Sequence, residues 1–203
     1  MKLYITPGSP YARMARIVVI EKGLERRVEI IMAQTRMADS PYYKINPSGR
    51  VPYLVRDDGI GLEESTVVCD YLDSFSGGPV CGLPGGGPAW EARRLEALAR
   101  SLLDGIAVWG REIVRPENER SPTVVNHETR RSERLADVWE REIASPLMHG
   151  ALNRIQLTLG CALGFEARIP GFRWRAGHPA LSEWFDRMAA RPSFVATAPP
   201  RSV

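Results

Sequence analysis

The chain has 203 residues and a mass of 22.6 kDa, which is long enough for one large domain or two small ones with separate cores. Its 44% hydrophobic and 25% charged content is ordinary for a soluble globular protein and excludes a disordered or fibrous chain. The net charge of +3 is spread along the sequence, so it indicates no nucleic-acid-binding surface.

The cysteines and histidines are too few and too scattered for a structural framework. Cys69, Cys81 and Cys161 are an odd set with neither a disulfide pattern nor metal-ligand spacing, and the three histidines form no ligand pair. The sequence starts on strand-like KLYIT without the features of a signal peptide. No apolar run approaches the roughly 20 residues that span a bilayer. We therefore expect a cytoplasmic protein without a metal or a membrane segment.

The first third of the chain changes its hydrophobic period every few residues. Helical spacing, a first-turn Pro10 and a terminal Gly23 predict a helix, and Asp57-Asp58-Gly59 predicts a hairpin turn. In chain order the pattern predicts a strand at 3–5, a helix at 10–22, a strand at 28–32, a turn after Ser40-Pro41, strands at 51–55 and 60–62, and a helix from Glu64-Ser65 through Leu72.

The rest of the chain predicts helices. Residues 76–88, SGGPVCGLPGGGP, are dense in glycine and proline and predict a linker. After it, helical spacing predicts helices at 89–115, 124–148, 159–165 and 179–190. The sequence therefore predicts a mixed α/β domain at 1–75, a linker at 76–88 and an all-helical domain at 89–203.

Ser9 has two interpretations. It can cap the helix that starts at Pro10, because a serine oxygen accepts from first-turn N–H groups. Its hydroxyl can also face a bound thiol, because a hydroxyl donor and a helix N-terminus both favour a thiolate. Together they would lower a thiol pKa by about one to three units. The residues alone leave both roles open.

Four motifs, in this order, resemble the cytosolic glutathione S-transferase family, and in particular its bacterial, serine-type members. They are SPYAR (9–13), INPSGRVPYL (45–54), EES (63–65) and HPALSEWFDRMAARPSF (178–194), and the resemblance covers essentially the whole chain. It implies a thioredoxin-like N-terminal domain that binds glutathione, followed by an all-helical domain that contributes the electrophile pocket. It also implies a homodimer.

The resemblance assigns roles to the first two motifs. Ser9 matches the catalytic hydroxyl, and Tyr4 and Tyr11 are weaker rivals for that role. Val51 matches the residue whose backbone N–H and C=O pair with the cysteinyl part of glutathione, before a cis Pro52. Arg50 is a candidate for the glycyl carboxylate, although an exposed arginine is commonly only solvated.

Glu64 and Ser65 match the positions that bind the γ-glutamyl end of glutathione. A carboxylate and a hydroxyl at a helix start also cap that helix, and the two roles are compatible. Asp104 loosely matches a residue that reaches across the dimer to the glutamyl ammonium, and a polar role at the dimer interface fits it equally well. Tyr11, Trp109 and Arg111 are candidates for the electrophile pocket by position only.

The resemblance implies a glutathione transferase that conjugates, or displaces a group on, small hydrophobic electrophiles. Glutathione is then a co-substrate, and no metal is needed. The alternatives are a glutathione-dependent isomerase or dehalogenase on the same scaffold, and a non-catalytic interaction module like the relatives that resemble stringent starvation proteins.

One stretch departs from the family pattern. The family has a Ser/Thr-x-x-Asp capping box at the start of a core helix, whereas the stretch here is LTLGCAL (157–163). We expect Thr158 to cap that helix and Cys161 to replace the reciprocal carboxylate. Cys161 is then either a buried structural cysteine or a thiol activated by a helix start.

Overall fold

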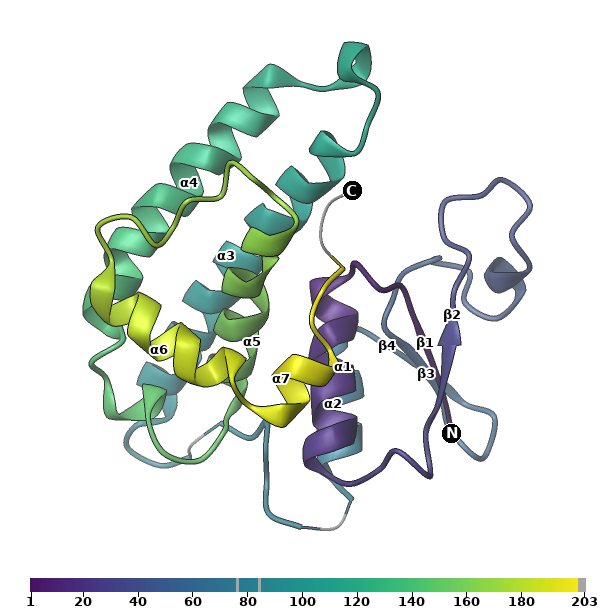
Figure 1. Ribbon diagram of the computed structural model, residues 1–203. Helices are drawn as coiled ribbons and strands as arrows, with labels where there is room; N and C mark the ends of the chain where they lie inside the picture. Colours follow the sequence, from purple (N-terminus) through teal and green to yellow (C-terminus); the bar gives the residue numbers. More distant parts are fainter. Residues whose placement is uncertain (76, 84, 201–203) are drawn as a thin grey trace. The chain divides into compact units, whose positions relative to one another are not determined.

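The computed structural model describes residues 1–75, 77–83 and 85–200 (Figure 1). The chain forms two compact units, Met1–Gly82 and Leu83–Val203. The division falls inside the stretch predicted as a linker, of which residues 76 and 84 lie outside the described part. The exact limits at 75 and 89 stay a prediction. The fold class is confirmed, with a mixed sheet in the first unit and helices in the second.

A four-stranded sheet forms the centre of the first unit. Its spatial order is β2 (Glu29–Met32), β1 (Lys2–Ile5), β3 (Tyr53–Val55) and β4 (Gly61–Glu63). β1 runs parallel to β2 and antiparallel to β3, and β3 runs antiparallel to β4. A parallel pair needs a crossover connection, which the helix between β1 and β2 supplies. The four strands follow one another along the chain as predicted, although β3 begins at Tyr53 rather than at residue 51.

Two helices, α1 (Pro10–Glu21) and α2 (Ser65–Asp73), lie side by side on one face of this sheet (Figure 1). α1 ends at Glu21, and Lys22 is its C-cap. Gly23 follows with a positive φ of 62°, a conformation that glycine adopts without strain. The core between helices and sheet is built from fully buried apolar side chains: Leu3, Met14, Ile17, Leu54 and Leu72. A 3₁₀ helix, η1 (Pro41–Lys44), follows β2.

A buried ion pair holds residues 77–81 against the C-terminal ends of α1 and α2. Lys22 Nζ lies 3.3 Å from Asp73 Oδ1 and donates to the carbonyls of Asp73 and Gly78 at 2.9 and 3.0 Å. The Asp73 carboxylate accepts from the backbone N–H groups of Val80 and Cys81. Burial raises the pKa of Asp73, but these donors outweigh it and hold the pKa below its usual value. The chain after α2 therefore stays fixed to the end of that helix.

The second unit is a helical bundle (Figure 1). α3 packs against both α4 and α5, while α6 packs against α4 and α5. Its long and short helices are α3 (Ala89–Ile113), α4 (Pro122–Glu142), α5 (Arg154–Leu163), α6 (Pro179–Ala189) and α7 (Pro192–Ala196), with 3₁₀ helices η2 (Glu117–Glu119), η3 (Pro146–Met148) and η4 (Gly164–Ala167) between them.

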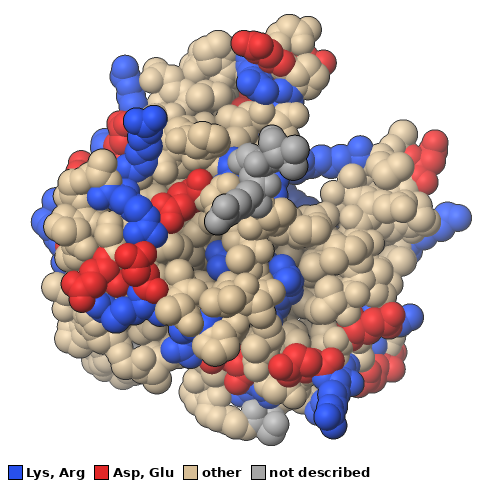
Figure 2. Space-filling view, in the orientation of Figure 1, with Lys and Arg blue, Asp and Glu red and all other residues tan. Residues whose placement is uncertain are grey.

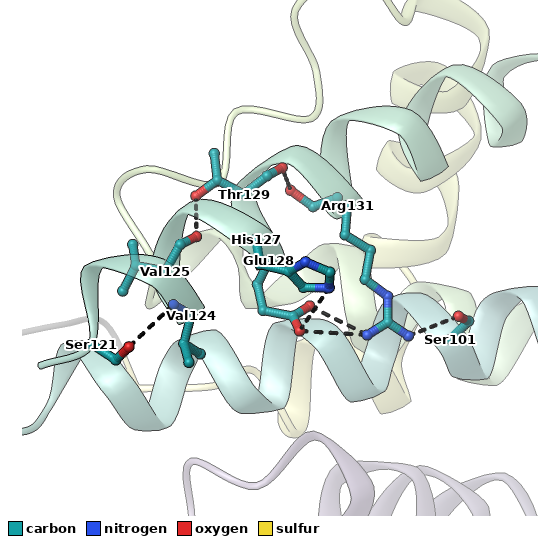
Figure 3. A network of polar contacts seen from close by, with 9 residues as sticks. Ser101, Ser121, Val124, Val125, His127, Glu128, Thr129 and Arg131 are labelled. Carbon is teal, nitrogen blue, oxygen red and sulfur yellow. Dashed lines mark hydrogen bonds and ion pairs between the residues drawn. The ribbon is translucent and has the colours of Figure 1, made fainter.

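A polar network connects α3 to α4 (Figure 3). Glu128 on α4 is 7% exposed and pairs with Arg131 at 3.4 Å, and Arg131 donates to Ser101 Oγ on α3 at 3.0 Å. A Cβ on Gly105 of α3 would lie 2.5 Å from Glu128 Oε2. Glycine inside a helix costs about 0.5–1 kcal/mol relative to alanine. At this position its missing side chain makes room for the buried carboxylate.

Charged side chains of both signs are interspersed over the face shown in Figure 2. Several charged side chains of the described residues form local pairs. Arg94 Nη2, for example, lies 2.6 Å from Glu91 Oε1 on α3 and 2.7 Å from Glu142 Oε2 on α4, so one guanidinium bridges two helices. Exposed pairs of this kind contribute at most about 1 kcal/mol each. Such pairs place carboxylates next to several of the basic side chains among the described residues.

The predicted helix at 124–148 is too long at its C-terminal end. α4 ends at Glu142, and Pro146–Met148 form the separate helix η3, which Ser145 caps through a bond from the Leu147 N–H. The residue before a proline is driven out of the helical conformation, so Ser145 cannot continue α4 into Pro146. Continuous apolar spacing across the break hid this boundary.

The predicted cap at Thr158 is wrong. α5 begins at Arg154, and Asn153 caps it by accepting from the N–H groups of Ile155 and Gln156. Thr158 lies inside α5, is fully buried, and its Oγ1 has no hydrogen-bond partner among the described residues. Cys161 is buried in the last turn, so it neither replaces a capping carboxylate nor lies at a helix start. Asn-x-x-Gln at 153–156 is itself a capping pattern. The side-chain amide of Gln156 donates to the carbonyls of Leu147 and Ala151.

Two substitutions in α5 should have opposite effects on stability. Asn153→Ala removes the cap and should lower the free energy of unfolding by about 1 kcal/mol. Thr158→Val removes an unpaired buried hydroxyl and keeps the shape, so it should raise that free energy by about 1 kcal/mol. Urea denaturation followed by circular dichroism measures both. Destabilisation by Thr158→Val would restore a structural role for its hydroxyl.

Candidate functional site

Ser9 is the N-cap of α1. Its Oγ accepts from the N–H of Ala12 at 3.1 Å, and its backbone is extended, as N-cap residues are. A serine hydroxyl carries one donor besides its acceptor lone pairs, and no described residue accepts the Ser9 O–H. The side chain is half-buried. Ser9 can therefore cap α1 through its oxygen and still donate its hydroxyl proton to a ligand.

The two tyrosine rivals lie in different environments. Tyr4, in β1, is 8% exposed and its ring packs against that of Tyr42 with centroids 5.4 Å apart. Tyr11 is half-buried in the first turn of α1. Tyr4 therefore belongs to the core, whereas Tyr11 stays close to Ser9 along the chain.

The Val51–Pro52 peptide bond is cis, as the resemblance implies. Val51 lies at a bend two residues before β3 and outside its ladder. Neither its N–H nor its C=O bonds to another described residue, and the residue is half-buried. Free peptide groups next to a sheet can pair with an extended peptide ligand.

Glu64 caps α2 from an unusual backbone conformation, with φ of 78°. Its Oε2 accepts from the N–H of Thr66 at 2.8 Å, and its Oε1 accepts from Ser65 Oγ at 3.0 Å. Ser65 is 3% exposed, while Glu64 is exposed. A positive φ in a residue other than glycine costs about 1–3 kcal/mol and is concentrated at functional sites. No pattern in the sequence predicts the positive φ of Glu64.

The register of the sheet brings Ser9, Val51 and Glu64 to the same end of the strands, which we call the ligand edge. Tyr4 in β1 is paired with Tyr53 in β3, and Tyr53 is paired with Glu63 in β4. The chain leaves β1 towards Ser9, enters β3 from Val51 and leaves β4 into Glu64, all at this edge. Three segments distant in sequence thus present a hydroxyl, an unpaired peptide and a helix start together. Such a set suits a small peptide with a carboxylate, an amide and a thiol.

The remaining predicted residues are Arg50, next to Val51 in the chain, and three residues of the second unit. Arg50 is exposed, and its guanidinium makes no bond to a described residue. Asp104, Trp109 and Arg111 belong to α3 in the second unit. Trp109 is 4% exposed and packs edge-to-face against Phe172, while the Arg111 Nε donates to the Ala107 carbonyl of its own helix. The assignment of Tyr11, Trp109 and Arg111 to an electrophile pocket stays a prediction, and so does that of Asp104 to the glutamyl ammonium.

Two further searches cover the described residues only. They contain no group of three or more His, Cys, Asp or Glu side chains placed to hold a metal ion. None of their helices combines the length and the apolar content needed to cross a membrane.

The fold defines a thioredoxin-like domain joined to a helical unit. Residues 3–79 match the family described as glutathione S-transferase, N-terminal domain. A glutathione transferase family member from Pseudomonas fluorescens Pf-5, solved with bound glutathione, is 31% identical with a TM-score of 0.86 and 98% coverage of both chains. The chain belongs to the glutathione S-transferase family, which confirms the resemblance.

Two other relatives extend over nearly the full length. A glutathione S-transferase from Methylobacillus flagellatus KT, solved with glutathione bound, is 29% identical with a TM-score of 0.84, covering 98% of this chain and 99% of its own. The uncharacterized GST-like protein YibF of Escherichia coli K12 is 28% identical over 206 residues, which is all of both chains. The resemblance to the serine type in particular stays a prediction.

Proposed function

We propose that this protein is a glutathione transferase in which Ser9 stabilises the thiolate of bound glutathione. The observation that carries the proposal is the convergence of Ser9, Val51 and the Glu64-Ser65 helix start at one edge of the sheet. Two relatives at 29–31% identity were solved with glutathione bound, which supports this ligand.

Each part of glutathione has a chemical counterpart at the edge. The unpaired N–H and C=O of Val51 pair with the cysteinyl residue in the manner of a strand. Glu64 takes the γ-glutamyl ammonium, and the N-terminus of α2 takes the γ-glutamyl carboxylate. Ser65 joins in by turning its hydroxyl from Glu64 Oε1 to that carboxylate. Pro52 keeps the chain turned beneath Val51, and Arg50 is within the same loop for the glycyl carboxylate.

Ser9 then acts on the sulfur. Its free O–H donates to the thiolate, and the N-terminus of α1 adds a favourable dipole. The thiol proton leaves to water, and the sulfur forms a bond to an electrophilic carbon of a small hydrophobic substrate. A leaving group departs with its electron pair in a displacement, whereas a conjugate addition ends with protonation of the substrate. Such chemistry fits a cytoplasmic detoxification role.

We also propose a homodimer, because the resemblance pairs the first domain of one subunit with the second domain of the other. Asp104 is exposed on α3, where a partner's glutamyl site could receive it. Multi-angle light scattering should give about twice the single-chain mass of 22.6 kDa. A monomeric mass at micromolar concentration would contradict the dimer and remove Asp104 from the site.

Reduced glutathione should bind the purified protein saturably, with micromolar to low millimolar affinity in isothermal titration. Ser65→Ala should weaken this binding about tenfold, because the hydroxyl contacts a charged carboxylate. Ser74→Ala is the matched control, because Ser74 is an exposed serine at the opposite end of α2. The absence of wild-type binding would defeat the enzyme assignment and leave a non-catalytic module.

Ser9→Ala should lower turnover with an activated aryl halide by about tenfold or more at saturating glutathione, because it removes a hydrogen bond to a thiolate worth about 1.5–3 kcal/mol. Glutathione affinity should change little. The substitution also removes a helix cap, so Ser121→Ala is the matched control: Ser121 caps α4 before Pro122 through a bond from the Val124 N–H. Equal turnover in wild type and Ser9→Ala would remove Ser9 from the chemistry.

A further inference from the structure

Two buried side chains converge on one backbone carbonyl next to Val51. The carbonyl oxygen of Arg50 accepts from the Tyr42 hydroxyl at 2.6 Å and from Asn46 Nδ2 at 3.0 Å. Asn46 Nδ2 also lies 3.4 Å from the Tyr42 hydroxyl, so the three groups form a closed cluster. This carbonyl and the Val51 N–H belong to the same peptide unit.

The cluster is anchored from several sides. Tyr42 is 3% exposed and its ring packs against Tyr4 of β1, while Asn46 is 1% exposed and its Oδ1 accepts from the Ser48 N–H at 3.1 Å. Burial raises the pKa of Tyr42 to about 12, so its hydroxyl remains a protonated donor at neutral pH. The two donors are therefore held in place before any ligand arrives.

Peptide geometry carries this constraint to the other side of the bond. The Arg50–Val51 peptide is planar and trans, so its N–H points opposite to its C=O. Donors that fix the carbonyl direction also fix the direction of the Val51 N–H. They polarise the peptide as well, because hydrogen bonds in a chain strengthen one another. The Val51 N–H, which no described residue accepts, is thus both aimed and made a better donor.

We infer that Tyr42 and Asn46 are positioning residues, which orient the Val51 N–H towards the cysteinyl carbonyl of glutathione. The inference rests on the proposed function. It assigns part of the ligand affinity to two side chains that do not touch the ligand. Their effect reaches the ligand through a single peptide bond.

The chain supplies a matched control on the same 3₁₀ helix. Tyr43 is the neighbour of Tyr42, and its hydroxyl bonds to no described residue. Its ring instead packs near Gly49, where a Cβ would lie 2.6 Å from Tyr43 Cε1. Tyr42→Phe and Tyr43→Phe therefore remove the same atom, but only the first breaks a bond to the peptide.

The test compares Tyr42→Phe, Tyr43→Phe and wild type by titration with reduced glutathione, thermal melting and the ¹⁵N–¹H resonance of Val51. Tyr42→Phe should weaken glutathione binding about fivefold, the equivalent of one ordinary hydrogen bond. The Val51 amide proton should move upfield in the ligand-free protein, because its peptide is less polarised. Turnover at saturating glutathione should stay unchanged, since Ser9 lies on another element. Tyr43→Phe should match wild type throughout.

The outcomes separate this inference from the function on which it rests. If wild type binds glutathione and Tyr42→Phe binds equally well with an unmoved Val51 resonance, the positioning role is overturned while the function stands. If wild type does not bind glutathione, both fall. Asn46→Asp keeps the acceptor for Ser48 but removes the donor to Arg50, so it gives a second measurement if Tyr42→Phe fails to fold. Weakened binding with the same Val51 shift supports the inference.

Discussion

Tyr4, Tyr53 and Glu63 lie side by side across β1, β3 and β4, and the candidate site depends on that register. A shift by one residue in β3 would turn its side chains to the opposite face and move Val51 out of line with Ser9 and Glu64. The buried side chains of Leu3 and Leu54, paired with one another across β1 and β3, oppose such a shift. Core packing thus fixes the position of the ligand edge.

Capping chemistry recurs along this edge. Ser9 and Glu64 each satisfy the first turn of a helix, and each keeps a polar group near the place where a ligand would bind. In the proposed function, stability and binding use the same atoms, so a loss of activity after substitution at either residue has two possible causes. Ser121, an equivalent Ser-Pro cap in the helical unit, separates these causes because it has only the structural role.

Local signals predicted much of the fold and some of the site. Pro10, Gly23 and the Asp57-Asp58-Gly59 turn act within a few residues, so the sequence places α1 and the hairpin correctly. The positive φ of Glu64 depends on how β4 meets α2, and no local pattern predicts it. The family's serine or threonine box predicts a cap at Thr158, whereas Asn153 gives the same first-turn bonds with an amide.

Recognition through the backbone changes which side chains matter. Val51 offers its peptide groups, so its own side chain has little direct influence on a bound peptide. The direction of those groups is instead set by side chains that reach the preceding carbonyl from η1 and the following loop. Sequence reasoning finds residues that touch a ligand, because their chemistry matches it. It does not find Tyr42 and Asn46, whose chemistry matches only the backbone of Arg50, and these contacts become visible only in three dimensions.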